Sequence, residues 1–247
     1  MISPAEFHEQ GSLEWLKERV GHITSSRIAD VISRTKGRAA TKTKPAMPGG
    51  YTAAYKDYAI ELIHGLETGD FYELGNFYQI SQGKELEPDA IEHYAFKLDV
   101  QTQRCGFLDV NAEELTQHGI LLAMGGSPDF LVWPNGGGEV KCPQKKNHTI
   151  WLGLDHVPAE HYAQCQANMW ICEAEWWDFV SYNPTFPPGM DLIIRRTFPD
   201  ESFIANMLAC CARLSEEVLA EVERRKDVPA VILEKRELIA QEELVEE

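Results

Sequence analysis

The sequence predicts an α/β fold in which a mixed central β-sheet is flanked by helices. Apolar residues recur at helical spacing in the first hundred residues and again after residue 200, whereas the middle carries short apolar runs bounded by glycine, proline and asparagine. The length of 247 residues suits one large domain or two small ones, and no repeat or linker divides the chain. We expect one domain over residues 1–229 and an acidic tail over residues 230–247.

The N-terminal part is expected to be helical around one long loop. The apolar spacing predicts two short helices within residues 11–33 and longer helices over 51–66 and 77–96. Pro88 predicts a kink or a fresh helix start within the last of these. The glycine- and proline-rich stretch that ends at Gly50 is expected to be a loop.

The middle of the chain is expected to supply the sheet. Strands are expected over residues 120–124, 130–133, 138–142, 177–182 and 192–198. The Pro-Asn-Gly-Gly sequence at residues 134–137 predicts a tight hairpin between the second and third of these. Helices are expected over residues 158–173 and 201–226, where the apolar period is again helical.

The composition excludes several classes of protein. Hydrophobic residues make up 44% and charged residues 25%, as in ordinary soluble globular proteins. No apolar run approaches the ~18 residues of a membrane span, and the N-terminus lacks the features of a signal peptide. The six cysteines form no Cys-x-x-Cys pair, so we expect buried, reduced thiols and a cytoplasmic protein without a membrane partner.

The charge is distributed unevenly along the chain. The net charge of −16 would repel a polyanion if it were spread uniformly. However, residues 31–50 contain no acidic residue and five basic ones: Arg34, Lys36, Arg38, Lys42 and Lys44. A local basic loop on an acidic body suits a site that receives a phosphate backbone at one place only.

The predicted hairpin carries two carboxylates and an ammonium group. Successive side chains of a strand alternate between its faces, so Glu139 and Lys141 share one face while Val140 points into the core. The hairpin turn places Asp129 beside them. Two adjacent carboxylates repel each other unless a cation lies between them. A hard divalent ion, held by carboxylate oxygens and the Val140 carbonyl, resolves this repulsion.

Such an ion would support hydrolysis of a phosphodiester by lowering the pKa of bound water and stabilising the leaving oxygen. Lys141 would orient or deprotonate the attacking water, or neutralise charge on the phosphorus. The same residues also fit a solvated strand face with an ordinary ion pair. Ser127-Pro128-Asp129 at the entrance of an apolar strand, and Cys142-Pro143 directly after Lys141, favour a functional site.

Four separated blocks of the sequence resemble the lambda-exonuclease/YqaJ family of phage recombination nucleases, which have the restriction-endonuclease-like PD-(D/E)XK fold. They span residues 19–170 in the family's order. The blocks are Arg19-x-Gly21-x-Ile23-Thr24-x-Ser26, Gly83-x-x-x-Glu87-x-x-Ala90, Ser127-Pro128-Asp129 with Glu139-Val140-Lys141-Cys142-Pro143, and Ala163-Gln164-x-Gln166 with Met169-Trp170. Each block is weak alone, but four in order form a specific signal.

The resemblance implies a magnesium-dependent exonuclease that digests one strand of linear duplex DNA from its 5′ end and leaves a 3′ overhang for a single-strand annealing protein. It implies two Mg²⁺ ions, with Mn²⁺ as a substitute, and a homotrimer that threads DNA. Asp129, Glu139 and the Val140 carbonyl would bind the metals, with Glu87 supporting the second ion. Lys141 would serve the attacking water, and Gln164 falls where the family has an active-site glutamine.

The resemblance also implies a pocket for the terminal 5′-phosphate, formed by Arg19, Ser26 and Ser127. A guanidinium binds a phosphate through two parallel hydrogen bonds, and hydroxyl groups donate to its other oxygens. Arg34 and Lys36, in the basic stretch, are the best candidates for contact with DNA near the cut.

Each of these residues has a structural alternative. Arg19 could pair with Glu14 or Glu18 on its own helix, and Ser26 could simply cap a helix. Glu87 could belong to a solvated helix face, and Gln164 and Gln166 could satisfy backbone groups. Two other classes of function also stay open: an endonuclease or repair nuclease without 5′-end preference, and a non-enzymatic DNA-binding or annealing protein.

Overall fold

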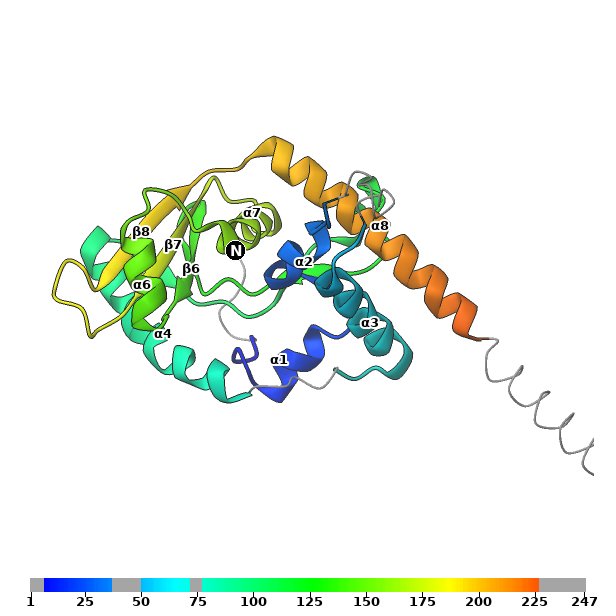
Figure 1. Cartoon of the computed structure of the whole chain (residues 1–247), viewed down its shortest axis with the longest axis horizontal. Helices are drawn as coiled ribbons and strands as arrows, with labels where there is room; N and C mark the ends of the chain where they lie inside the picture. The colour runs from blue at the N-terminus through cyan, green and yellow to red at the C-terminus, as the bar shows by residue number, and fades with distance from the viewer. Residues whose placement is uncertain (1–6, 37–49, 72–76, 227–247) are drawn as a thin grey trace, which may run out of the picture.

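The computed structural model describes residues 7–36, 50–71 and 77–226 (Figure 1). Its main sheet has five strands in the order β2-β5-β6-β7-β8, and only the β6–β7 pair is parallel, so the sheet is mixed as predicted. These strands are β2 (Thr102–Gln103), β5 (Phe130–Val132), β6 (Gly136–Lys141), β7 (Trp176–Tyr182) and β8 (Leu192–Thr197). A smaller sheet joins β1 (Ile23–Thr24), β4 (Met124–Gly126) and β3 (Leu108–Asp109) in the order β1-β4-β3.

Helices cover both faces of the main sheet. On one face, α4 (Phe77–Leu98) packs Tyr94 against Val140 and Val180. On the other face, Trp151 of α6 (Lys145–Leu152) and Met169 of α7 (Ala159–Ile171) pack with Trp177 and Phe179 of β7. Because strand side chains alternate, the face that carries Glu139 and Lys141 is the one beneath α6 and α7.

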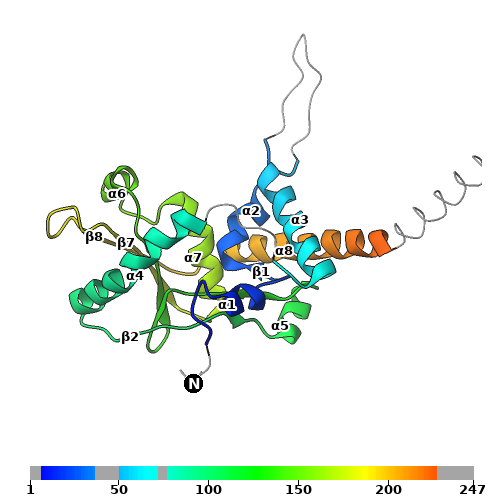
Figure 2. The ribbon, with the colours of Figure 1, turned by 90° about the horizontal axis from the view of Figure 1, so that it is seen from below.

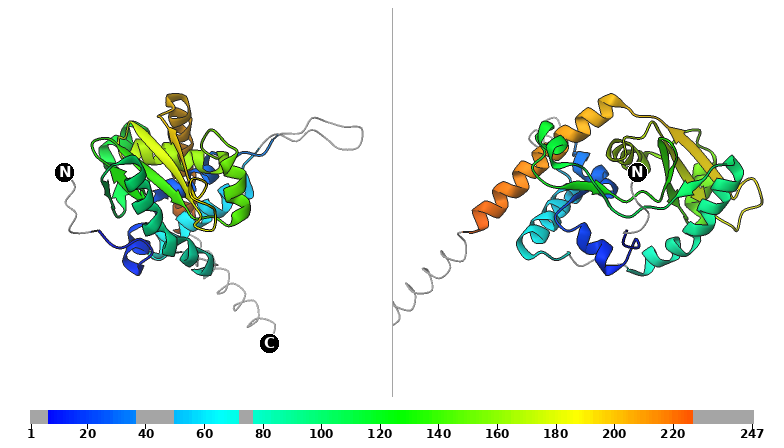
Figure 3. Two further views of the ribbon diagram at one scale, coloured as in Figure 1. Left: turned by 90° about the vertical axis from the view of Figure 1, so that its left-hand side faces the viewer. Right: turned by 180° about the vertical axis from the view of Figure 1, so that it is seen from behind.

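The remaining helices form a second half of the molecule beside the sheet (Figures 1 and 2). Their shared core includes Val31, Leu62 and Leu214. Ala163 and Ala167 of α7 also lie in this core, while Met169 of α7 packs on the sheet, so α7 belongs to both halves. Figure 3 shows α8 from behind, where it extends away from the sheet. The helices of this half are α1 (Leu13–Glu18), α2 (Ile28–Ile32), α3 (Ala53–Thr68), α5 (Ala112–Gln117) and α8 (Glu201–Lys226). Within the described residues, no helix is long and apolar enough to cross a membrane.

Most of the predicted helices are present at the expected places. The two short helices of residues 11–33, the helices over α3 and α7, and both ends of α8 agree with the sequence pattern. A fresh start at Pro88 is wrong, because α4 runs through this residue as one helix. The helices α5 and α6 were not predicted from the sequence.

The hairpin differs from the predicted one in where its turn ends. β6 begins at Gly136, so the turn is shorter than residues 134–137. A Cβ atom on Gly136 would lie 2.1 Å from the Trp176 ring, and one on Gly138 would lie 2.1 Å from the Phe130 ring. These glycines therefore serve to admit large rings above the strand rather than to turn the chain.

The strand predicted over residues 120–124 is also displaced. β4 begins at Met124 and continues through Gly125 and Gly126. Ile120 and Leu122 are buried in the core without forming a strand, which explains their apolar pattern. A Cβ atom on Gly125 would lie 2.5 Å from the Leu108 carbonyl oxygen, so glycine permits the close pairing of β3 and β4.

A buried polar cluster joins α4 to the edge of the sheet. Asp178 of β7 is fully buried, and its carboxylate accepts hydrogen bonds from the Tyr94 hydroxyl at 2.7 Å and from Arg196 Nε and Nη2 at 2.9 and 2.8 Å. The Arg196 guanidinium lies 3.7 Å from the centre of the Trp176 ring. The Tyr94 hydroxyl and the Arg196 guanidinium therefore share one hydrogen-bond acceptor, the Asp178 carboxylate.

Asp178→Ala should lower the free energy of unfolding by about 2–3 kcal/mol, because a buried tyrosine hydroxyl and an arginine lose their acceptor together. Urea unfolding measures this change. Asp155→Ala is the matched control, since the Asp155 side chain is fully exposed beside His156, and it should leave the stability at the wild-type value. Equal stabilities of the two variants would contradict the role assigned to the cluster.

Candidate active site

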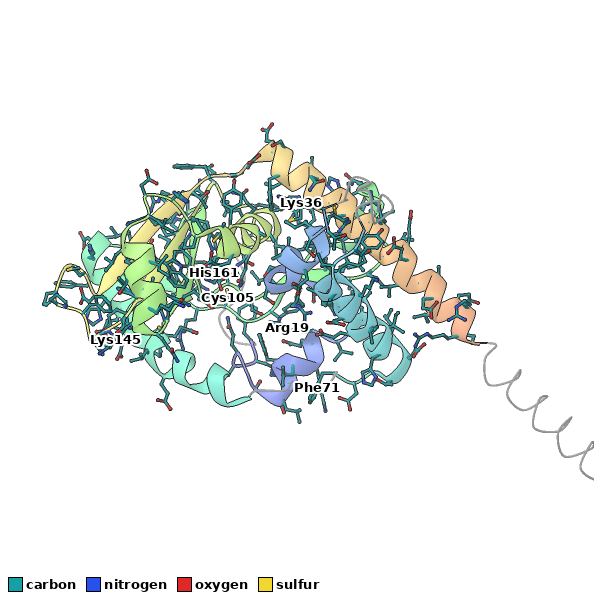
Figure 4. All side chains as sticks on the ribbon, in the orientation of Figure 1. Arg19, Lys36, Phe71, Cys105, Lys145 and His161 are labelled. Atoms are coloured by element: carbon teal, nitrogen blue, oxygen red, sulfur yellow. The ribbon has the colours of Figure 1, made fainter. Side chains whose placement is uncertain are left out.

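One cavity of about 640 Å³ lies between the sheet and the N-terminal helix α1. Its walls include every residue that the sequence predicts for catalysis, metal binding and 5′-phosphate binding. These residues are Arg19, Ser26, Glu87, Ser127, Asp129, Glu139, Val140, Lys141 and Gln164. Figure 4 places Arg19 and His161 toward the middle of the molecule. The structure thus brings together residues more than 140 positions apart in the sequence.

The β5–β6 hairpin positions the charged groups as the strand alternation predicts. Asp129 precedes β5, and its Oδ2 accepts a hydrogen bond of 2.6 Å from the Val140 N–H. Lys141 Nζ donates to Glu139 Oε1 at 2.5 Å, and Asn168 Nδ2 donates to Glu139 Oε2 at 3.2 Å. The Glu139 side chain is only 2% exposed, whereas the Val140 side chain packs in the core on the other face.

The charge of Glu139 acts on the pKa of Asp129, and both carboxylates act on the pKa of Lys141. Burial, followed by the charge of Glu139, raises the pKa of Asp129 well above its usual range. Burial alone would lower the pKa of Lys141, but Glu139 and Asp129 outweigh it, and the pKa is raised. Lys141 is therefore charged at neutral pH and neutralises only part of the negative charge in the cavity.

The oxygen ligands of this site fit a hard divalent cation in part. Asp129, Glu139 and the Val140 carbonyl offer oxygen ligands, which Mg²⁺ prefers, and the raised pKa of Asp129 marks a place where a cation is favourable. Glu87 does not complete a cluster of three acidic, histidine or cysteine side chains, and the described residues contain no such cluster. Its carboxylate instead lies 3.3 Å from Arg104 Nη2.

A second group of contacts surrounds Arg19. Its Nη2 donates to the Ser26 hydroxyl at 3.0 Å, and its guanidinium lies 4.1 Å from the centre of the Trp15 ring. Burial lowers the pKa of Arg19, and within the described part of the chain it forms no ion pair. Glu18 instead contacts His8, at 3.6 Å. The predicted alternative, a pair with Glu14 or Glu18, is thus not formed, and the guanidinium faces the cavity without a carboxylate partner.

Trp15 is a residue of this site that the sequence analysis did not identify. Its Nε1 donates to the Ser127 hydroxyl at 2.9 Å while its ring stacks against Arg19. It therefore connects the two parts of the predicted phosphate pocket. The spacing offered a signal, because Trp15 lies four positions before Arg19 and so shares its face of the helical turn.

The two glutamines of α7 have different environments. Gln166 is fully buried, donates to the Phe198 carbonyl at 2.9 Å and accepts from the Asp200 N–H at 2.9 Å. It satisfies backbone groups, which was the structural alternative for both glutamines. Gln164 lies in the wall of the cavity instead.

Neither predicted DNA-contacting residue lines the cavity. Arg34 donates to the Val31 and Ser33 carbonyls at 2.9 and 2.8 Å, and its guanidinium lies 4.6 Å from the centre of the Tyr51 ring. Lys36 is exposed, near α2 and α8 in Figure 4. The other basic residues of the loop, and the acidic tail over residues 230–247, lie outside the described residues. Contact of Arg34 and Lys36 with DNA stays a prediction.

The sequence profile of YqaJ-like viral recombinase domains matches residues 14–175. This match covers well over half of the chain and contains every residue of the cavity named above. The chain belongs to this family. The resemblance inferred from the four sequence blocks is therefore confirmed.

Solved structures support the assignment of this YqaJ-like domain. An alkaline exonuclease, LHK-Exo from Laribacter hongkongensis, is 28% identical, with a TM-score of 0.72 over 90% of this chain and all of that chain. Its complex with dAMP gives 29% identity and a TM-score of 0.73 at the same coverage. A phage-related exonuclease from Haemophilus somnus 129PT, at 14% identity, covers 81% of this chain and 96% of that chain with a TM-score of 0.56, and shows the fold alone.

These similarities confirm the restriction-endonuclease-like α/β fold predicted from the sequence. A search of curated proteins found no significant match.

Proposed function

We propose that this YqaJ-like domain is a metal-dependent exonuclease that digests the 5′-terminated strand of linear duplex DNA and leaves a 3′ single-stranded overhang. One observation carries the proposal. A single cavity contains both a carboxylate pair with a lysine and an arginine without a carboxylate partner. The first group suits phosphodiester hydrolysis, and the second suits a terminal phosphate dianion.

The residues of the carboxylate pair would hold the ion and the attacking water. Asp129, Glu139 and the Val140 carbonyl would bind Mg²⁺, with Mn²⁺ as a substitute, and Glu87 would assist a second ion. The metal supplies charge stabilisation and a more acidic water when bound. The Lys141 ammonium orients the attacking water and offsets the negative charge that develops on the phosphate oxygens. Asn168 fixes the Glu139 carboxylate by donating to its second oxygen.

The arginine side of the cavity would select the DNA end. Arg19 binds the terminal 5′-phosphate, while Ser26 and Ser127 donate hydrogen bonds to its remaining oxygens. The structure of LHK-Exo with dAMP supports this reading, because a mononucleotide is the expected product of such a reaction. A 5′-phosphorylated duplex end is therefore the proposed substrate.

Family membership alone supports three wider proposals. The domain would act in DNA recombination as a homotrimer, would hand its 3′ overhang to a single-strand annealing protein, and would work in the cytoplasm. An endonuclease or repair nuclease on the same fold is the second candidate, because it would use the same carboxylates and lysine without needing the Arg19 pocket.

Arg19→Ala should remove the preference for 5′-phosphorylated ends, because the terminal phosphate then loses its charged donor. Linear duplexes with one 5′-phosphate and one 5′-hydroxyl end, labelled on each strand, report polarity and preference in a single digestion. Wild type should digest the phosphorylated strand at least about tenfold faster. The variant should digest both strands at similar, low rates.

Arg224→Ala is the control, since Arg224 pairs with Glu221 on the exposed surface of α8, and it should keep the wild-type preference. Wild-type cleavage of closed circular duplex, or equal rates from the two ends, would instead support the endonuclease candidate. Intact DNA at every concentration of the wild-type protein would contradict both.

A further inference from the structure

His161 lines the cavity but has no part in the chemistry proposed so far. It lies in the first turn of α7, three residues before Gln164, so the two side chains occupy the same face of the helix. Figure 4 places His161 near the centre of the molecule. The ring is half-buried, and it forms no hydrogen bond or ion pair with any residue that the structure describes.

Aromatic neighbours fix the orientation of this ring. His161 stacks on Phe179, with ring centres 5.1 Å apart and planes at 17°, and it meets Trp151 edge-on at 5.1 Å. Phe179 is fully buried on β7 and pairs in register with Glu139 of β6. The imidazole is therefore held directly beside the strand that carries the carboxylate and the lysine.

His148 shows how a purely structural histidine is satisfied in this protein. It is fully buried, with Nδ1 2.8 Å from the Ser181 hydroxyl and Nε2 2.8 Å from the Met190 carbonyl oxygen. Both nitrogens thus have partners, and Nε2 must carry the proton because a carbonyl only accepts. His161 has the same two nitrogens, but neither has a hydrogen-bond partner among the described residues, and the side chain lines the cavity proposed to receive a phosphate.

The charge of the imidazole decides what it can bind. Burial and the nearby Lys141 ammonium lower the pKa of His161 to about 4, so the ring is neutral at neutral pH. A neutral imidazole offers one N–H donor and adds no positive charge beside a metal. Because Mg²⁺ prefers oxygen ligands, the ring is better suited to the substrate than to the ion.

We propose that His161 is a further catalytic residue, which donates a hydrogen bond from its imidazole N–H to a phosphate oxygen of the DNA strand being cut. This inference rests on the proposed nuclease function. It would give α7 two groups that contact the substrate, Gln164 and His161, which line the same cavity as Arg19.

The test compares two substitutions that separate the shape of the ring from its N–H group. His161→Phe keeps the aromatic contacts with Phe179 and Trp151 but removes both nitrogens. His161→Gln keeps an N–H donor but loses the ring. His118→Phe is the matched control, because His118 is an exposed histidine that packs edge-on against Trp170 outside the cavity.

Single-turnover cleavage of a 5′-phosphorylated duplex with Mg²⁺ gives the rate, and calorimetry without DNA gives Mg²⁺ affinity. We expect His161→Phe to lower the single-turnover rate by about tenfold, as for the loss of one hydrogen bond to a charged group. Its melting temperature and Mg²⁺ affinity should match wild type. His161→Gln should retain more activity than His161→Phe, and His118→Phe should retain all of it.

Three results would overturn the assignment. A wild-type rate in His161→Phe would mean that the N–H is not used. A larger loss of activity in His161→Gln than in His161→Phe would mean that the shape of the ring matters and its N–H does not. A fall in Mg²⁺ affinity that parallels the rate would make His161 a metal ligand. Failure of the wild-type protein to cut DNA would contradict the nuclease function itself. In that case, binding of the 5′-phosphorylated duplex still tests the hydrogen bond from His161 to the phosphate: weaker binding by His161→Phe, but not by His118→Phe, would support it.

Discussion

Lys141→Ala should abolish cleavage while leaving DNA binding nearly unchanged. Among the residues that the structure describes, Lys141 is the only lysine that lines the cavity, and its ammonium lies 2.5 Å from Glu139 Oε1. Its raised pKa keeps it charged, so its removal deletes a cation where negative charge develops in the transition state. Loss of one such preorganised donor lowers turnover by about 10²–10³-fold.

Lys145→Ala separates this effect from a general loss of positive charge. Lys145 is exposed in the first turn of α6, four residues further along the chain and outside the cavity, so its substitution should leave the rate within about twofold of wild type. Fluorescence anisotropy with labelled duplex measures binding for both variants. Turnover in Lys141→Ala comparable to that of Lys145→Ala would mean that the active site is elsewhere.

The sequence predicted the chemistry of the hairpin because strand geometry is local. Alternation along β6 places Glu139 and Lys141 on one face whatever the rest of the fold does, and a short connection must return the chain past Asp129. The exact turn was not predictable, since Gly136 and Gly138 look like turn residues until Trp176 and Phe130 are known to occupy the space above them.

Contacts between distant segments were visible in the sequence only through the family resemblance. No local rule brings Arg19, directly after α1, to the same cavity as Glu139, because 120 residues separate them and the approach depends on how the helical half packs against the sheet. For the same reason Trp15 and His161 were missed. Each acts through neighbours from other elements, Ser127 for the tryptophan and Phe179 for the histidine.

Asp129→Asn should abolish Mg²⁺ binding and cleavage, yet stabilise the metal-free protein. The raised pKa of Asp129 means that its ionisation opposes folding, with a penalty that appears above its ordinary pKa of about 4 and grows until the pH reaches the raised value. Asparagine removes this penalty and keeps an oxygen that accepts from the Val140 N–H. In EDTA at pH 7.5 the variant should therefore melt above wild type, and this advantage should shrink toward pH 4.

Mg²⁺ should reverse the order of the two melting temperatures, so that wild type melts above Asp129→Asn. An ion that binds only the folded protein raises its stability by RT ln(1 + [Mg²⁺]/Kd), so wild type should gain melting temperature as Mg²⁺ is added while Asp129→Asn should not. Asp155→Asn, at a fully exposed site, controls for the loss of one negative charge and should behave as wild type. An equal gain of melting temperature in Asp129→Asn and wild type would show that the ion binds without this carboxylate. The decisive result is that the change in melting temperature caused by Asp129→Asn has opposite signs with and without Mg²⁺. If Asp129 were merely structural, its substitution would destabilise the protein under both conditions.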